Sequence, residues 1–367
     1  MKQGQKPSSP DIKALAEAVQ RLSHLLTRER ERLPDAYLND HELRQAYLQY
    51  FLPVNRAKII VPLQELSLHP AGLLSGCMLR VLDIGSGPGT SILGILDFFE
   101  KRGTPPILEF TAVDAVPGNL SEAERLFRAA AAGYGSKASI KTMVRSFGEG
   151  SGRVEGTFDL IVLSNVLNEL FHDKPDRNQR RAGVLADLLK TSLAATGSCI
   201  IIEPSLRETS RDLLSLRDAL VIAGFTIYSP CLTQEPCPAL VNPRDWCHED
   251  RPWEAPQLIR EIDSLIGLRK DSLKFSYLVV RRDTRAVGGP FPEGAFRVVS
   301  EPLVTKGKRE LFLCGTGGRR QVMRQDKDAS PENAAFTELL RGDVVRFKGL
   351  VDEVKRLRVT KETVVIL

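Results

Sequence analysis

The stretch that decides the fold is Leu79-Arg80-Val81-Leu82-Asp83-Ile84-Gly85-Ser86-Gly87-Pro88-Gly89-Thr90. Its apolar first half predicts a buried strand, and the apolar residues that follow it predict a helix. Three glycines stand at alternate positions between the two. Glycine allows left-handed backbone angles and lets bare N–H groups approach a ligand that side chains would block. The stretch therefore predicts a ligand site where the strand meets the helix.

The glycine spacing narrows the choice of ligand. It is not the Gly-x-Gly-x-x-Gly pattern of dinucleotide-binding folds, and no Lys-Ser/Thr pair of a P-loop follows it. The pattern Asp-x-Gly-x-Gly-x-Gly resembles motif I of the class I S-adenosylmethionine (SAM) methyltransferases. In that family a second acidic residue, at the end of the next strand, takes the ribose hydroxyls. The resemblance implies SAM as cofactor, bound by Asp83, Gly85, Gly87, Gly89 and Asp114.

Strand and helix patterns alternate from Leu79 to about Arg282, which is typical of a parallel sheet with helices on both faces. Seven strands are expected, at 79–84, 108–114, 140–145, 158–163, 198–203, 225–229 and 275–281. Helices are expected at 90–101, 119–133, 177–195 and 206–223. The predicted fold class is α/β, a Rossmann-like class I methyltransferase fold with a doubly wound sheet of seven strands.

The remaining segments complete the predicted domain organisation. Residues 1–76 are expected to form a helical cap, in which the aromatic residues near Tyr47 serve as core packing. Residues 77–283 form the SAM-binding domain, with a cysteine-rich insertion at 230–272. Residues 284–367 contain five short apolar runs, which are compatible with a small β-rich barrel of OB type.

Composition and charge exclude some classes of protein and favour others. The chain has 367 residues, of which 42% are hydrophobic and 26% charged, as in a globular protein without membrane spans. The N-terminus lacks the apolar core of a signal peptide, so a cytoplasmic location is expected. The net charge is +5, and residues 281–367 alone hold 18 Lys and Arg against 12 Asp and Glu. Such a basic segment is compatible with RNA binding or with a solvated surface.

The exit of the fourth strand offers the candidate catalytic residues. Asn165, Asn168 and Glu169 follow this strand, where the residues of class I methyltransferases face the methyl group. Neither the Asn-Pro-Pro-Tyr signature of base-amino methyltransferases nor a Pro-Cys nucleophile occurs there. Methyl transfer can depend largely on positioning the donor in line with a nucleophile, so the missing signatures do not exclude it.

Four cysteines form a candidate metal site. Cys231, Cys237 and Cys247 fall within 17 residues of a proline-rich loop, and Cys314 could supply a fourth ligand. Their intervals are not the two-residue knuckles of zinc ribbons. Four thiolates suit tetrahedral zinc or an iron–sulfur cluster, and the residues alone leave unpaired thiols as the alternative.

The motifs together resemble the ribosomal small-subunit methyltransferase-like family, which comprises a mitochondrial small-ribosomal-subunit assembly factor and its bacterial relatives. The resemblance covers roughly residues 33–348. It is carried by the glycine loop, Asn165-Val166-Leu167-Asn168-Glu169-Leu170, Pro230-Cys231, Cys237-Pro238, Asp245-Trp246-Cys247-His248, Arg251 and Phe275-Ser276-Tyr277-Leu278. By position it implies that the four cysteines hold a four-iron four-sulfur (4Fe-4S) cluster, and that the partner is small-subunit ribosomal RNA.

Three functions are compatible with these features. The first is SAM-dependent methylation of small-subunit rRNA, and the second is a non-catalytic SAM- and RNA-binding role in subunit assembly. The third is a small-molecule methyltransferase with a structural zinc, for which the basic C-terminal segment would be dispensable. We expect a monomer with no membrane partner and no DNA partner. Arg319, Arg320, Arg324, Arg346, Lys348, Lys355, Arg356 and Arg358 are expected to decorate the RNA-facing surface.

Overall fold

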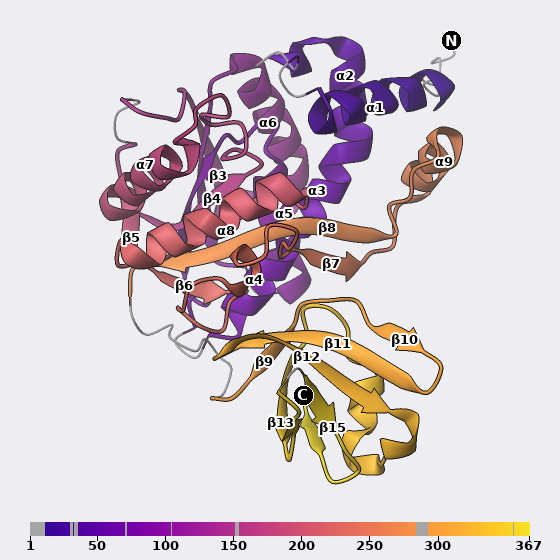
Figure 1. Cartoon of the computed structure of the whole chain (residues 1–367). Coiled ribbons are helices and arrows are strands. Elements are labelled where there is room, and N and C mark those ends of the chain that lie inside the picture. The colour runs from indigo at the N-terminus through magenta and orange to yellow at the C-terminus, as the bar shows by residue number, and fades with distance from the viewer. Residues whose placement is uncertain are drawn as a thin grey trace.

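The computed structural model describes residues 12–29, 32, 36–69, 72–103, 105–150, 154–283, 293–354 and 356–367. A large sheet with helices on both faces is preceded by helices and followed by a smaller, separate sheet (Figure 1). The predicted fold class, a class I methyltransferase fold with a helical N-terminus and a β-rich C-terminal region, is confirmed.

The large sheet has the strand order β3-β2-β1-β4-β5-β8-β6. Its strands are β1 (Met78–Ile84), β2 (Ile107–Asp114), β3 (Ala138–Val144), β4 (Phe158–Ser164), β5 (Leu193–Pro204), β6 (Thr226–Ser229), β7 (Glu249–Pro252) and β8 (Ser272–Arg281). The first five strands pair in parallel, whereas β8 runs antiparallel to β5 and β6. This is the order of the class I methyltransferase fold. The predicted seven strands are present, and β7, from the cysteine-rich insertion, adds an eighth along β8.

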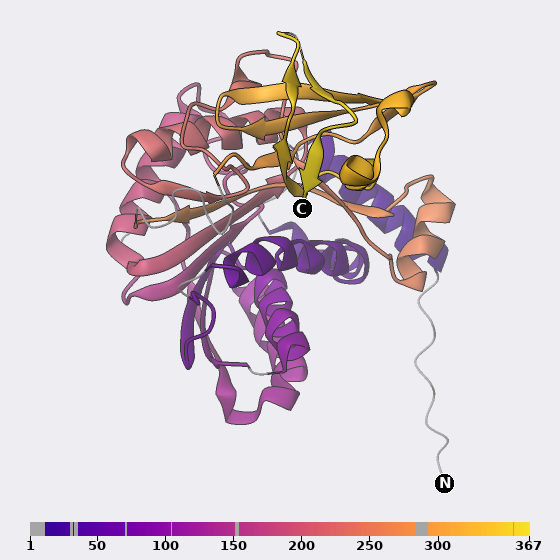
Figure 2. The ribbon, with the colours of Figure 1, turned by 90° about the horizontal axis from the view of Figure 1, so that it is seen from below.

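Helices cover both faces because successive strand residues point to opposite sides. These helices are α5 (Thr90–Arg102), α6 (Pro117–Ala130), α7 (Arg177–Ser192) and α8 (Arg207–Ile222), whereas α9 (Gln257–Ile266) packs against the helices that precede the sheet. Val81 belongs to the core shared with α5 and α6, whereas its neighbour Leu82 belongs to the core shared with α7 and α8. Figure 2 shows the sheet between these two groups of helices.

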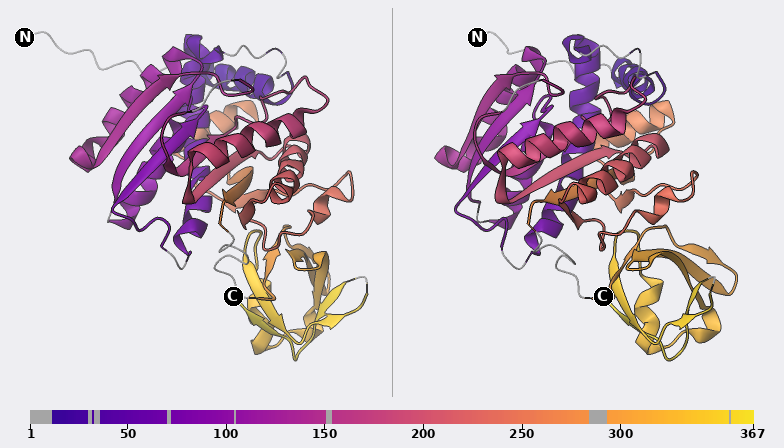
Figure 3. Two further views of the ribbon diagram at one scale, coloured as in Figure 1. Left: turned by 90° about the vertical axis from the view of Figure 1, so that its left-hand side faces the viewer. Right: turned by 60° about the vertical axis from the view of Figure 1, so that its left-hand side comes forward.

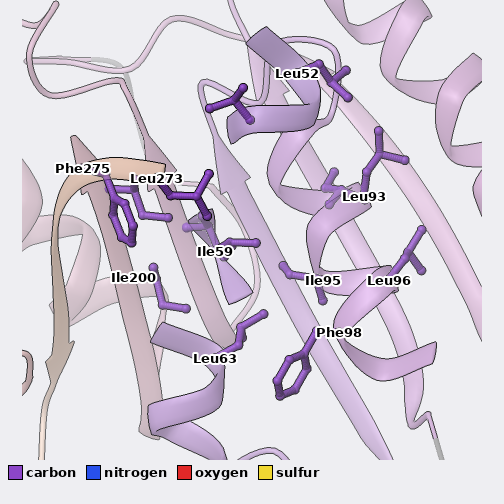
Figure 4. Packing of buried hydrophobic residues seen from close by; sticks show 14 of the residues in the cluster. Leu52, Ile59, Leu63, Leu93, Ile95, Leu96, Phe98, Ile200, Leu273 and Phe275 are labelled. Carbon is purple, nitrogen blue, oxygen red and sulfur yellow. The ribbon is translucent and has the colours of Figure 1, made fainter. Parts of the chain in front are cut away.

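The N-terminal helices are part of the first of these cores. They are α1 (Ile12–Thr27), η2 (Tyr37–Asn39), α2 (His41–Ala46), the π-helical turn η3 (Tyr47–Phe51), α3 (Leu52–Lys58) and α4 (Ile60–Ser67). Ile59 and Leu63 lie beside Ile95 and Phe98 of α5 and beside the sheet (Figure 4). A Cβ on Gly94 would lie 2.5 Å from the Arg56 carbonyl oxygen, so the close approach of α3 to α5 requires glycine there.

The C-terminal strands form one curved sheet of their own (Figure 3). They are β9 (Phe296–Val298), β10 (Leu303–Thr305), β11 (Lys308–Gly315), β12 (Gly318–Gln325), β13 (Val344–Lys348), β14 (Val351–Asp352), β15 (Leu357–Val359) and β16 (Val364–Ile366). Each of the five predicted runs contains a strand, namely β9, β11, β12, β13 and β16, and the structure adds β10, β14 and β15. The OB-type relationship and the domain division stay predictions, and the predicted boundary at 283/284 adjoins residues outside the described ranges.

Candidate functional site

The glycine loop joins β1 to α5 in left-handed backbone conformations. Gly85, Gly87 and Gly89 have φ angles of 61°, 53° and 81°. A Cβ on Gly85 would lie 2.4 Å from Val166 Cγ2, whereas no described atom lies within 4 Å of the place that a Cβ on Gly87 would take. Gly85 is therefore required by packing, and Gly87 leaves open space above the backbone that a ligand can enter.

Asp83 lies beneath this loop. It is 1% exposed, and the Ser86 hydroxyl donates a hydrogen bond of 2.8 Å to its Oδ2 atom. Among the described residues, Oδ1 has no partner. Burial raises the pKa of Asp83 to about 7, and the charge of Asp114 adds to the shift while the Ser86 hydrogen bond opposes it. Asp83 thus supports the loop from below through a carboxyl group whose ionised form is destabilised by burial.

Asp114, at the end of β2, orients the same loop. Its Oδ2 accepts the Gly87 N–H at 2.8 Å, and its Oδ1 accepts the Val116 N–H at 2.9 Å and the Asn119 side-chain amide at 3.1 Å. The structure therefore brings together Asp114, Asp83 and the three glycines at the carboxyl ends of β1 and β2, as the sequence predicted. Ligands of doubly wound sheets bind at this edge.

A cavity of about 790 Å³ opens beside this edge, between the segment that follows β3 and helix α7. Ile84 and Val113, which end β1 and β2, form part of its lining. Ser146 and Phe147 line it from the exit of β3, close to Asp114, whose carbonyl accepts the Arg145 N–H at 2.9 Å. The sequence analysis missed these residues, although their place after the third strand could have indicated them.

Tyr47 is a second neighbour that the sequence analysis missed. Its hydroxyl lies 3.3 Å from Thr90 Oγ1, at the start of α5. Burial raises the pKa of Tyr47, and the nearby carboxylates of Glu169 and Asp83 raise it further. The N-terminal helices therefore contribute a side chain to the surroundings of the glycine loop. No sequence pattern distinguishes Tyr47 from the aromatic residues that only pack in the core.

The three catalytic candidates after β4 are not gathered into one group. Asn165 has a left-handed φ of 59°, which is uncommon for a non-glycine residue, and Glu169 is near enough to Tyr47 to shift its pKa. Asn168 instead lines a cavity of about 10 Å³ between β5, α7 and α8, beside Arg181. Its side-chain amide is buried and has no hydrogen-bond partner among the described residues. The catalytic roles of the three residues stay predictions. The position of Asn168 does not favour a catalytic role for this residue.

The four cysteines line one cavity, of about 50 Å³, between α8, the cysteine-rich loop and β11. Burial raises the pKa of Cys314 to about 12, and the neighbouring thiols of Cys231 and Cys237 contribute to the shift. Burial also raises the pKa of Cys247, with Cys314 the next cause. Within the described ranges, however, no three His, Cys, Asp or Glu side chains surround a point closely enough to hold a metal ion. The four-iron cluster and the zinc alternative stay predictions.

Side chains of helix α8 hold the cysteine-rich loop through hydrogen bonds to the backbone of the loop. The loop contains little regular structure, so its buried carbonyls need donors from elsewhere. Arg211 donates to the carbonyls of Ala239, Asn242 and Asp245 at 3.1, 2.9 and 2.7 Å. Asp218 accepts the Cys237 N–H at 3.1 Å, and the buried Arg217 donates to the carbonyl of Thr233. These side chains fix the loop between Cys231 and Cys247.

The basic residues of the C-terminal sheet are less available than the sequence predicted. Arg324 is buried, where it donates to the Asn333 carbonyl at 3.0 Å, so its prediction as a surface residue was wrong. Arg320 pairs with Asp352 at 2.7 Å. Arg356 and Arg358 both pair with Glu353. Arg346 is half-buried and Lys348 exposed, while Lys355 lies outside the described residues.

A family model described as "Mitochondrial small ribosomal subunit Rsm22" matches residues 74–338, which contain the glycine loop and all four cysteines. The chain belongs to this family. The resemblance stated from the sequence is confirmed. A search of curated proteins found no match.

Solved structures resemble this Rsm22 family member only distantly. A putative class I SAM-dependent methyltransferase from Listeria monocytogenes is 11% identical, with 74% of this chain and 81% of that chain covered and a TM-score of 0.38. YjhP from E. coli is 14% identical, covering 74% and 99%, with a TM-score of 0.34. A SAM-dependent methyltransferase from Geobacter sulfurreducens, solved with S-adenosyl-L-homocysteine, is 15% identical, covering 61% and 90%, with a TM-score of 0.33. The fold assignment depends on the strand order, not on these scores.

The comparisons leave some expectations open. Among the described residues, no helix is long and apolar enough to cross a membrane. The cytoplasmic location stays a prediction that the family description, which names a mitochondrial subunit, does not support. The monomeric state and the exclusion of DNA stay predictions as well.

Proposed function

We propose that this Rsm22 family member binds SAM at the carboxyl edge of the large sheet and methylates RNA of the small ribosomal subunit. The observation that carries the proposal is the open space above Gly87, whose N–H is fixed by Asp114. The family description, which names the small ribosomal subunit, supports the choice of RNA.

The chain's own residues would bind and position the donor. Gly87 would lie under its methionine part, and Asp83 would place a negative charge beneath the loop, opposite the donor's cationic groups. The cavity beside Phe147 would take its adenosine part. SAM supplies an activated methyl group, so the protein's main task is to align it with the RNA nucleophile. Asn165 and Glu169 would face the acceptor.

A test compares methyl transfer from radiolabelled SAM to small-subunit RNA by the unmodified chain and by Gly87→Ala. The added methyl group would occupy the space for the donor. Gly103→Ala is a matched control, because Gly103 also has a left-handed φ, of 74°, and open surroundings, but lies at the far end of α5. Methylation that Gly87→Ala abolishes and Gly103→Ala retains supports the proposal. Equal incorporation by both variants contradicts it.

The position of Asn168 favours a second candidate, a non-catalytic role in subunit assembly. Its amide lies in the small cavity beside Arg181, so the strand exit presents fewer polar groups to an acceptor than the sequence suggested. In this case the chain binds SAM and the subunit without producing methylated RNA. Gly87→Ala would then weaken subunit binding in a sedimentation assay, and no label would be incorporated by any variant.

We further propose that Cys231, Cys237, Cys247 and Cys314 hold the iron–sulfur cluster. Their common cavity supports this assignment. Tetrahedral zinc with Zn–S bonds of about 2.3 Å requires its sulfurs to lie about 3.8 Å apart, whereas a four-iron cluster spaces its thiolate ligands more widely. The described residues hold no group close enough for a single metal ion, so the choice between cluster and zinc depends on metal analysis. The cluster would join the cysteine-rich loop to β11.

Metal analysis of anaerobically purified protein tests this assignment. We expect iron and sulfide with visible absorbance, and a loss of both in Cys314→Ser. Cys77→Ser is the control, because Cys77 is exposed and lies outside the cysteine cavity. Colourless protein with one equivalent of zinc would show that the cluster assignment is wrong.

A further inference from the structure

Two aromatic side chains lie exposed beside the cysteine cavity, and each is stacked against a neighbour. Trp246 is 37% exposed, and its ring stacks on that of His248 with centroids 5.8 Å apart and planes 18° apart. Phe312 is 39% exposed, and the Arg319 guanidinium lies 4.7 Å from its ring centroid. Single exposed aromatic residues are common on protein surfaces, but these two belong to ordered pairs.

The two pairs belong to one surface, because Arg319 connects them. Arg319 lies over Phe312 and also forms an ion pair of 3.4 Å with Asp245, the residue before Trp246. Phe312 and Cys314 occupy alternate positions of β11 and therefore point to the same face of the strand. The strand face that brings Cys314 to the other cysteines thus also brings Phe312 toward the loop that carries Trp246.

Both aromatic residues are held by backbone hydrogen bonds. Arg211 of α8 donates to the carbonyl of Asp245 at 2.7 Å, directly before Trp246. The Phe312 N–H donates to Ser300 Oγ at 2.8 Å. A surface that is already ordered loses less conformational entropy when it binds a partner.

The chemistry of this surface fits unpaired bases. Proteins bind single-stranded nucleic acid by stacking bases on aromatic rings and on arginine, within a positively charged surface. The segment that carries Phe312 and Arg319, residues 281–367, holds 18 basic against 12 acidic residues, although Arg320, Arg356 and Arg358 are paired with carboxylates and Arg324 is buried. Bases of an RNA duplex are already stacked on one another, so they cannot use such rings. We infer that Trp246, His248, Phe312 and Arg319 form an aromatic platform for single-stranded RNA.

The aromatic platform deepens the proposed function and rests on it, because it assigns the surface through which the chain contacts small-subunit RNA. Two bases or more would stack on Trp246 and Phe312, and Arg319 would add its charge between them. The surface would select unpaired segments without reading their sequence, because every base has a π-face.

Fluorescence gives a direct test, because the chain contains only two tryptophans. Trp253→Phe in the full-length protein leaves Trp246 as the sole tryptophan. A mixed-sequence single-stranded RNA oligonucleotide should quench its emission by stacking. The same oligonucleotide in a duplex, and dextran sulfate as a polyanion without bases, should leave the emission nearly unchanged. Equal quenching by dextran sulfate would overturn the inference.

Affinity measurements on variants provide an independent test. Trp246→Ala and Phe312→Ala should each weaken binding of the single-stranded RNA by about 5- to 30-fold. The salt dependence should stay unchanged, because no phosphate contact is removed. Phe312→Tyr should retain the affinity, and equal thermal unfolding and metal content would show that the variants are intact. Ile222→Ala, which changes an 87% exposed residue at the end of α8, is the control.

The outcomes separate this inference from the proposed function. If RNA binds the unmodified chain and both alanine variants equally, the inference of an aromatic platform is wrong, but the proposed RNA binding stands. This is also the result expected if the rings bind a protein partner instead. If the unmodified chain binds no RNA, the inference and the RNA part of the proposed function both fail. Loss in either alanine variant, with retention in Phe312→Tyr and Ile222→Ala, supports the platform.

Discussion

Arg297, on β9 of the C-terminal sheet, donates hydrogen bonds to both carboxylate oxygens of Glu65 on α4, at 2.7 and 3.2 Å. Both side chains are buried, with 4% and 11% exposed. The guanidinium also donates to the Gly342 carbonyl at 2.9 Å. An ion pair inside the protein thus joins the helices that precede the large sheet to the sheet that ends the chain.

We expect Arg297→Met to lower the free energy of unfolding by about 3–5 kcal/mol, because it leaves the Glu65 carboxylate buried without a cation. The double variant Arg297→Met with Glu65→Met should lose less than the single variant, since no uncompensated charge remains. Chemical denaturation measures both. The exposed pair Arg21 and Glu42 provides the control, in which Arg21→Met should cost no more than about 1 kcal/mol. A double variant whose loss of free energy of unfolding equals the summed losses of Arg297→Met and Glu65→Met would contradict this account.

Gly85→Ala and Gly87→Ala should separate the packing role of the loop from its binding role. Gly85→Ala should destabilise the protein strongly, because its Cβ would overlap Val166, and Val166→Ala should restore part of the loss. Gly87→Ala should cost only about 1–2 kcal/mol of backbone strain and still abolish SAM binding. Thermal unfolding and calorimetric titration with SAM measure the two effects. SAM binding by Gly87→Ala at the affinity of the unmodified chain would exclude this loop as the donor site.

The stability of the ligand-free protein should depend on pH through Asp83. Its pKa is raised from 3.8 to about 7, so between these values the folded state keeps a proton that the unfolded state releases. The contribution of this group to the free energy of unfolding therefore falls as pH rises from about 4 to 7, by at most about 4 kcal/mol, and is level above 7.

Asp83→Asn removes this titration, so its stability relative to the unmodified chain should improve as pH rises from 4 to 8. Denaturation at several pH values measures the difference. Asp187→Asn, at an exposed position of α7, should leave the pH profile unchanged. Parallel profiles for the Asp83 variant and the unmodified chain would show that Asp83 is not the titrating group.

Arg211→Met should free the cysteine-rich loop, because four loop carbonyls would lose a charged donor. We expect a loss of about 1–3 kcal/mol in the free energy of unfolding. Limited proteolysis should then cut the chain between residues 239 and 245, with sites mapped by mass spectrometry. Arg207→Met, at an exposed position of the same helix, is the control. Unchanged proteolysis would mean that the loop is held by other contacts.

The large sheet could be predicted from the sequence because its strands are continuous apolar runs. The runs at Val81–Ile84 and Cys199–Ile202 are buried on both faces. The strands β10 and β14 could not be predicted, because they consist of three and two exposed residues that pair through the backbone alone. Short strands of this kind depend on the neighbour that offers them hydrogen bonds.

The candidate site was predictable only in part. The three glycines and Asp114 have fixed spacing along the chain, and the fold brings them together as expected. The direction of Asn168 depends on Glu203, which accepts its backbone N–H at 3.3 Å, and on Arg181, which donates to its carbonyl. Tyr47 reaches the loop through helix packing. Such contacts join residues that are distant in sequence, and no local pattern encodes them.

Gly94 has a consequence for any shortened version of this chain. Its missing side chain lets α3 lie along the back of α5, whose first residue, Thr90, adjoins the glycine loop. A truncated chain that began at β1 would expose Leu93 and Phe99 to water. It would also lack Tyr47, whose hydroxyl contacts Thr90. The helix that presents the loop would then lose its brace. The residues before the first strand accordingly support the helix that follows the glycine loop, so a fragment without them is a poor sample in which to measure binding.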